Sequence, residues 1–214
     1  MSMIVPTITT DDLGKYKELV TEFYPFATRV QIDVSDGIFA PTTLISEDKV
    51  WWPQGWEADI HMMVARPSEH MDALLSLKPS MVIFHVEVEE DITSLLNILK
   101  RSGIKAGVAL QKTTFPGHVT QVIALADHVM IFCGDLGKQG GRASMMQLEK
   151  VRLIKQINAE VEIGWDGGVN IDNAFLIAQG GVDVLNVGSA ISSAPNPETV
   201  YKALTVEINK HGIF

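Results

Sequence analysis

Three residues of this sequence could do chemistry together: Asp33, His61 and Asp166, each within or at the end of a short apolar run. Taken singly, an Asp after such a run usually caps a turn or a helix, and a His inside one is usually a hydrogen-bonded core residue. Two carboxylates and one imidazole in a single cavity have another use, because they can hold a divalent metal or act as a pair of acid–base groups. The three residues therefore predict a metal or proton-transfer site if the fold brings their runs together.

Two glycine turns, Gly167-Gly168 and Gly188-Ser189, follow the last two apolar runs. Glycine allows backbone N–H groups to approach an anion closely, and a helix beginning at Ser189 would add the positive end of its dipole. One Gly-Gly pair is weak evidence because turns use it constantly. Two such turns after neighbouring strands predict a phosphate-binding site.

The elements that must position these residues are eight short runs that alternate with segments of helical periodicity. The runs are continuous rather than alternating in hydropathy, which is typical of parallel strands buried on both faces. The expected strands cover residues 4–8, 29–34, 58–64, 81–86, 104–110, 128–133, 161–165 and 182–187. The expected helices cover residues 11–23, 68–77, 92–102, 117–126, 144–157, 171–179 and 197–210. Eight such units within 214 residues predict a single domain, residues 1–214, folded as a (β/α)8 TIM barrel.

In such a barrel the active site lies at the carboxyl ends of the strands, where all the residues named above are expected. The connection from residue 34 to residue 58 is longer than the others and contains Pro41, Pro53, Gly55 and three Trp residues. Long loops in compact domains are usually functional, so we expect this one over the mouth of the site. It would serve there either as a ligand contact or as a packed cover.

The overall composition limits the partners. The net charge is −9, with 17 Lys and Arg against 26 Asp and Glu and no basic cluster, which argues against nucleic acid. No apolar stretch reaches the ~18 residues that a membrane helix needs. The sequence begins without a secretory signal and contains one cysteine, Cys133, so we expect a cytoplasmic protein. The sequence is compatible with a homo-oligomer but does not indicate one.

These residues resemble the ribulose-phosphate 3-epimerase family, and the resemblance extends over nearly the whole chain. The segments that carry it are residues 4–8, 33–41, 59–67, 85–87, 107–110, 166–168 and 188–191. The resemblance implies a barrel of the ribulose-phosphate-binding type. It also implies an isomerase that interconverts ribulose 5-phosphate and xylulose 5-phosphate by inversion at C3.

The same resemblance implies roles for individual residues. Asp33 and Asp166 would be the acid–base pair, one removing the proton beside the ketone and the other returning it from the opposite face. Asp33, His61 and Asp166 would hold one divalent metal ion, Zn, Mn or Fe, whose charge stabilises the enediolate. The residues expected to bind this small phosphorylated sugar are Thr7, His61, Gly137, Gly167, Gly168, Gly188 and Ser189.

Several positions depart from the family pattern, which indicates a divergent member. Gln31 stands two residues before Asp33, where the family has His. An amide oxygen is a weaker ligand than imidazole, so Gln31 is expected to be a weak fourth ligand and the metal to be loosely held or absent. Segment 134–139 replaces a glycine-rich family loop. Asp135 in this segment would repel a phosphate, and Lys138 could compensate.

The sequence leaves three functions open. The first is epimerisation of ribulose 5-phosphate with Gln31 tolerated. The second is epimerisation of another ketose phosphate, in a pocket reshaped by segment 134–139. The third is binding of a sugar phosphate without catalysis. A related decarboxylase or hexulose-phosphate synthase would have Lys at position 35, where this chain has Ser35.

Overall fold

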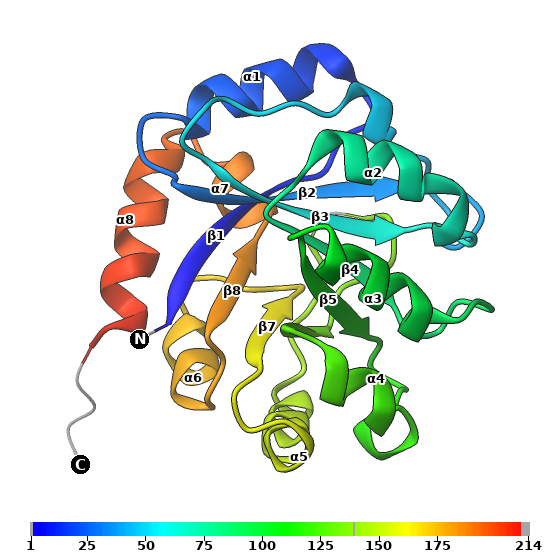
Figure 1. The fold of residues 1–214 in the computed structure, drawn as a ribbon. Helices are drawn as coiled ribbons and strands as arrows, with labels where there is room; N and C mark the ends of the chain where they lie inside the picture. Colours follow the sequence, from blue (N-terminus) through cyan, green and yellow to red (C-terminus); the bar gives the residue numbers. More distant parts are fainter. Residues whose placement is uncertain (1, 139, 211–214) are drawn as a thin grey trace.

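A computed structural model describes residues 2–138 and 140–210, which form a closed barrel of eight parallel strands surrounded by helices (Figure 1). The strands follow one another around the barrel in sequence order, and β1 closes it by pairing with β8. They are β1 Met3–Ile8, β2 Arg29–Ser35, β3 Glu57–Met63, β4 Met81–His85, β5 Lys105–Leu110, β6 His128–Phe132, β7 Glu162–Asp166 and β8 Val184–Val187. The predicted (β/α)8 fold is therefore confirmed.

The helices lie outside the strands and cover the outer face of the barrel (Figure 1). The α-helices are α1 Leu13–Phe23, α2 Met71–Leu77, α3 Ile92–Arg101, α4 Thr120–Leu125, α5 Glu149–Ile157, α6 Ala174–Gln179, α7 Ser189–Ser192 and α8 Pro197–Ile208. Short 3₁₀ turns are η1 Glu47–Lys49, η2 Pro67–His70, η3 Pro116–His118 and η4 Met145–Leu148. No helix within the described ranges is long and apolar enough to cross a membrane.

Some helices begin later than their periodicity predicted. The helix expected from residue 171 begins at Ala174, because Asn173 Oδ1 accepts a hydrogen bond from the Asn170 backbone N–H at 2.9 Å and holds a turn there. The helices expected from residues 68 and 144 begin as η2 and η4 before they become α-helical. Helix periodicity indicates which face is buried but not whether the first turn is α-helical.

The continuous apolar runs of the strands reflect two different cores. In β4, Met81 and Ile83 point into the barrel, where they pack with side chains from β5 and β6. Their neighbours Val82 and Phe84 point outward and pack under the helices. Successive side chains of a strand face opposite ways, so a strand between two apolar layers is apolar at every position.

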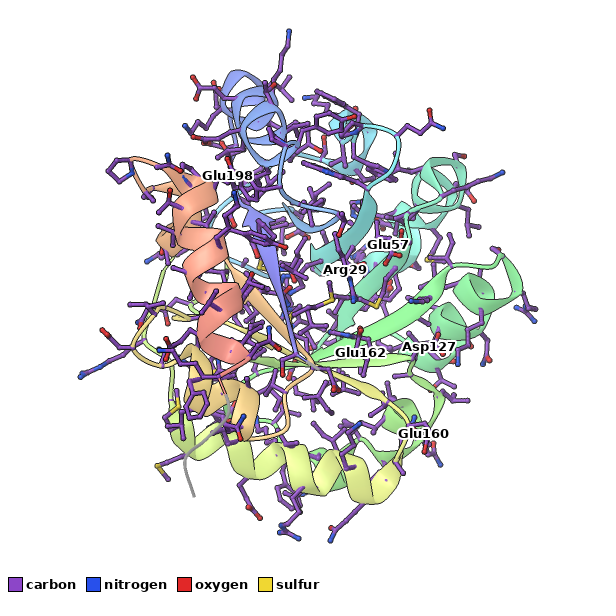
Figure 2. All side chains as sticks on the ribbon, turned by 90° about the vertical axis from the view of Figure 1, so that its left-hand side faces the viewer. Arg29, Glu57, Asp127, Glu160, Glu162 and Glu198 are labelled. Atoms are coloured by element: carbon purple, nitrogen blue, oxygen red, sulfur yellow. The ribbon has the colours of Figure 1, made fainter. Side chains whose placement is uncertain are left out.

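The amino end of the barrel is closed by an ionic cluster. Arg29, at the start of β2, donates to Asp59 Oδ2 at 2.7 Å and to both oxygens of Glu162 at 2.9 and 2.8 Å. His128 Nδ1 lies 2.7 Å from Glu162 Oε2. Arg29 and Glu162 both lie near the centre of the view in Figure 2. Sequence analysis assigned no role to the members of this cluster, which belong to β2, β3, β6 and β7.

The long connection from β2 to β3 packs against the carboxyl end of the barrel, as expected. Phe39 lies against the ring of His85 with 4.9 Å between ring centroids. Ala40 and Leu44 form a small apolar cluster with Met63 at the end of β3. The connection therefore packs beside the strand ends that carry the predicted site.

Candidate active site

A cavity of about 130 Å³ opens at the carboxyl end of the barrel. Most of the predicted site residues line it: Thr7, Asp33, Gly137, Asp166, Gly167, Gly168, Gly188 and Ser189. No residue of the long β2–β3 connection lines it, so that connection covers the site from the side without forming its wall. The two remaining predicted residues, Gln31 and His61, are buried and contact the lining carboxylates from within the barrel.

The structure brings Asp33, His61 and Asp166 together. Asp33 on β2 pairs in register with His61 on β3, so both side chains point into the barrel. One ligand atom from each of the three residues lies within 4.8 Å of the other two. His61 Nδ1 is 3.0 Å from Asp33 Oδ1. Two carboxylates and an imidazole at this spacing fit a divalent cation.

Gln31 joins the two carboxylates directly. Its amide Nε2 donates to Asp33 Oδ1 at 2.9 Å and to Asp166 Oδ2 at 2.5 Å. Its Oε1 is buried and has no hydrogen-bond partner among the described residues. The amide thus occupies the position of the family His as a donor between two anions, with its potential ligand atom, the oxygen, turned away from them.

The electrostatics of the site favour the protonated form of Asp166. Burial and the negative charge of Asp33 together raise the pKa of Asp166 to about 7, against smaller opposing effects of His61 and Gln31. Burial alone would lower the pKa of His61, but its hydrogen bond to Asp33 and the charges of Asp33 and Asp166 raise it. A carboxyl that titrates near neutral pH beside a second carboxylate is an arrangement suited to acid–base catalysis.

The turn after β7 can be formed only by residues without a Cβ atom. Gly167 and Gly168 have φ values of +112° and +70°, which L side chains rarely adopt. A Cβ atom on Gly167 would lie 2.0 Å from the backbone nitrogen of Gly134, and one on Gly168 would lie 2.3 Å from that of Ala143. The Gly167-Gly168 turn therefore packs tightly against the segment after β6. The turn and this segment both line the cavity.

The segment after β6 also lines the cavity through Asp135, Gly137 and Lys138, while Gln139 lies outside the described residues. Asp135 Oδ1 is 3.6 Å from Lys112 Nζ, which comes from the connection after β5. Lys112 thus offsets the charge of Asp135, a role that the sequence suggested for Lys138. Both partners of this pair are exposed, so its contribution to stability is small.

Three residues at the site were given no role by sequence reasoning. Thr9 lines the cavity and donates to Asp33 Oδ2 at 2.7 Å. Its position two residues after Thr7 places it on the same inward face, so strand alternation could have identified it. His85 is fully buried and contacts His61, and Glu87 contacts His85. Burial lowers the pKa of His85 to about 4, so this imidazole is neutral at neutral pH.

Comparisons with known proteins identify the family to which this chain belongs. A model of the ribulose-phosphate 3 epimerase family matches residues 3–192. A protein named ribulose-phosphate 3-epimerase from Helicobacter pylori (strain J99 / ATCC 700824) is 28% identical over 94% of this chain and 95% of its own length. The protein of that name from Escherichia coli (strain K12) is 24% identical over 97% of this chain and 96% of its own. A solved structure of 3-hexulose-6-phosphate synthase shares the fold, with a TM-score of 0.73 and 17% sequence identity. The alignment covers 96% of this chain and 99% of the synthase chain.

Proposed function

Because the chain belongs to the ribulose-phosphate 3-epimerase family, we propose that it interconverts ribulose 5-phosphate and xylulose 5-phosphate by inversion at C3. The observation that carries the proposal is the pair Asp33 and Asp166, which face one cavity from β2 and β7. The alternative of a non-catalytic binding barrel would not require two carboxylates in contact with the same amide. The partner is a small phosphorylated sugar, and we expect the enzyme to act in the cytoplasm.

Each carboxyl group has a part in the proposed proton transfer. One removes the proton from C3 and the other returns a proton from the opposite face, which inverts the centre. Asp166, with a pKa of about 7, can hold or release a proton near neutral pH. Thr9 and Gln31 donate to Asp33 from two sides and so fix the direction of its carboxylate.

A divalent metal would be held by Asp33, His61 and Asp166, whose ligand atoms lie close enough together. When bound, it would supply positive charge beside the substrate oxygens. We expect Zn, Mn or Fe, and weak binding, because Gln31 presents its N–H groups to the carboxylates. The residues of this chain would bind and orient the sugar and would exchange protons with it.

The phosphate of the substrate is proposed to bind between the turns Gly167-Gly168 and Gly188-Ser189. Both turns line one cavity, and the backbone N–H groups of such turns can bind phosphate without a side-chain charge. A phosphate or sulfate soak of crystals is expected to place the anion between these turns. An anion found only at another position would contradict this assignment.

The acid–base roles are tested by Asp33→Asn and Asp166→Asn, which keep the size of the side chain and remove the base. Each is expected to lower kcat for ribulose 5-phosphate by ~100-fold or more, the usual effect of losing a positioned base. Exchange of the C3 hydrogen with solvent deuterium gives a second measurement. Asp172→Asn, at an exposed position outside the cavity, is the matched control. An Asp33→Asn enzyme with near-normal turnover would show that the roles are wrong.

Another ketose phosphate is the second candidate, because Asp135 and Lys138 line the cavity in a segment that departs from the family pattern. The two candidates differ in the sugar and share the chemistry. Assays of kcat/KM on a panel of pentulose and hexulose phosphates distinguish them. A higher value for a hexulose phosphate than for ribulose 5-phosphate would favour the second.

A further inference from the structure

Three side chains inside the barrel each bury an oxygen atom that has no hydrogen-bond partner among the described residues. They are Thr7 on β1, Gln31 on β2 and Asn186 on β8, which are 3%, 0% and 3% exposed. The atoms concerned are Thr7 Oγ1, Gln31 Oε1 and Asn186 Oδ1. Buried polar atoms in folded proteins are nearly always hydrogen-bonded, and where the protein offers no partner a bound water usually does. These oxygens therefore point to a bound polar molecule.

The strand register arranges the three side chains around one space. Thr7 pairs with Gln31 across β1 and β2, and Asn186 pairs with Asp166 across β8 and β7. Asn186 also pairs with Val5, which lies two residues before Thr7 on the same face of β1. Gln31 Nε2 donates to Asp166 Oδ2 at 2.5 Å. That hydrogen bond closes a ring of side chains from the consecutive strands β7, β8, β1 and β2.

A sugar in the active-site cavity does not account for all three oxygens. Thr7 lines the cavity, but Gln31 and Asn186 do not, so the sugar would not reach their oxygens. The Gln31 amide is not free to turn its oxygen toward another donor, because its Nε2 is held by Asp33 and Asp166. The occupant of the space is therefore small, and it donates one hydrogen bond to each of the two amide oxygens.

We propose that Thr7, Gln31 and Asn186 bind one water molecule beneath the Asp33–Asp166 pair, and that this water holds the Gln31 amide with its oxygen turned away from the carboxylates. The two O–H groups of a water match the two amide oxygens, and its own oxygen can accept a hydrogen bond from the Thr7 hydroxyl. Three hydrogen bonds are typical of a buried water. The inference rests on the proposed function only in that Gln31 stands where the family pattern has a metal ligand.

Neutron diffraction from deuterated crystals of the metal-free wild-type protein tests the water site directly. We expect one water, with its deuterons directed at Gln31 Oε1 and Asn186 Oδ1 and with the Thr7 hydroxyl deuteron directed at the water. A space without a water would overturn the proposal. So would a cation, recognised by contacts of about 2.0–2.6 Å and by the lack of deuterons. This measurement needs neither metal nor activity, so its outcome is independent of the proposed epimerase function.

The consequence for the Gln31 amide is tested with Asn186→Leu, which removes one partner of the water at similar side-chain size. Without the water, turning Gln31 Oε1 toward a metal no longer costs the hydrogen bond to that water. Titration with Zn²⁺ alone is therefore expected to show affinity raised roughly 2- to 10-fold, the effect of one neutral hydrogen bond. Val184→Ala, which changes the packing two residues earlier on the same face of β8, should leave the Zn²⁺ affinity unchanged. Unchanged affinity in Asn186→Leu, or an equal rise in both variants, would overturn the proposal.

Discussion

At the scale of single residues, Gln31 is the position that sets this chain apart from the family pattern. Its two amide N–H groups contact both carboxylates of the candidate site, at 2.9 and 2.5 Å. A donor between two carboxylates reduces their mutual repulsion, which is part of what a cation would do there. Bringing Oε1 toward a metal would require the amide to turn, and the two N–H hydrogen bonds would be lost.

Replacing Gln31 by His tests this interpretation. Gln31→His introduces a better ligand and removes the competing N–H donors, so Zn²⁺ affinity should rise about 10-fold or more, the scale on which one group near a metal acts. Epimerase activity on ribulose 5-phosphate should rise with it. Calorimetric titration with Zn²⁺ and parallel kinetic assays give both quantities.

The control for Gln31→His is Gln121→His, which places a new imidazole on an exposed position of α4. Equal gains in the two variants would mean adventitious surface binding and would contradict the role of Gln31. Tight metal binding without activity would place the block elsewhere in the pocket. Segment 134–138, with Asp135 and Lys138, would then be the part to exchange.

At the scale of elements, the turn from β7 to α6 depends on its lack of side chains. Gly167 has a φ of +112°, and a Cβ atom there would lie 2.5 Å from the carbonyl carbon of Cys133. The strain and the overlap are separate costs. Gly55 offers a comparison, because its φ is +97° but a Cβ atom there would meet nothing within 4 Å.

We expect Gly167→Ala to lower the free energy of unfolding by more than Gly55→Ala, whose cost should be about 1–3 kcal/mol of backbone strain alone. Gly167→Ala should also raise KM for ribulose 5-phosphate, because the turn must move away from the segment after β6. Urea unfolding and steady-state kinetics measure the two effects. If both substitutions destabilised the protein equally and KM were unchanged, the close approach of Gly167 to the segment after β6 would matter neither for stability nor for substrate binding.

At the scale of the whole molecule, the two ends of the barrel have different tasks. The carboxyl end carries the cavity, and the amino end carries the ionic cluster of Arg29, Asp59, His128 and Glu162. Burial alone would raise the pKa of Glu162, but hydrogen bonds from Arg29 and His128 and their charges lower it well below its usual range. The cluster joins β2, β3, β6 and β7, so its contribution is to the stability of the closed barrel.

Glu162→Gln is expected to lower the free energy of unfolding at pH 7 by about 1.5–3 kcal/mol, the range for a hydrogen bond to a charged group. Since the folded pKa of Glu162 is depressed, its stabilisation is present above the unfolded pKa of about 4.3 and is lost as the pH falls below it. The difference between wild type and variant should therefore shrink on acidification. Urea unfolding at several pH values measures it.

The control for Glu162→Gln is Glu160→Gln, an exposed residue near the same end of the barrel (Figure 2). It removes an equal charge without removing the contacts to Arg29. We expect a change within about 0.5 kcal/mol, as is usual for surface substitutions. If the difference in free energy of unfolding between wild type and Glu162→Gln stayed constant down to pH 3, a role for the carboxylate charge would be contradicted.

The sequence by itself determined the barrel and most of the candidate site. Continuous apolar runs separated by helical segments have few other arrangements than a parallel sheet covered on the outside. Parallel strands end on the same side, so Asp33, Asp166 and the turn at Gly167 were placed at one end by local pattern alone. Thr9 lies two residues after Thr7, so the alternation of side chains along a strand could also have predicted it as a site residue.

Only the tertiary structure decided which side chains touch across the barrel. The contact of Gln31 with Asp166 joins β2 to β7, and that of Arg29 with Glu162 joins the same two strands at the other end. The contact of His61 with His85 depends on the pairing of β3 with β4. A shift of one residue in strand register reverses the face of every side chain, and no local pattern records the register between strands far apart in the sequence. Closure of the barrel fixes that register, and with it the hydrogen bonds that orient the carboxylates and the imidazole.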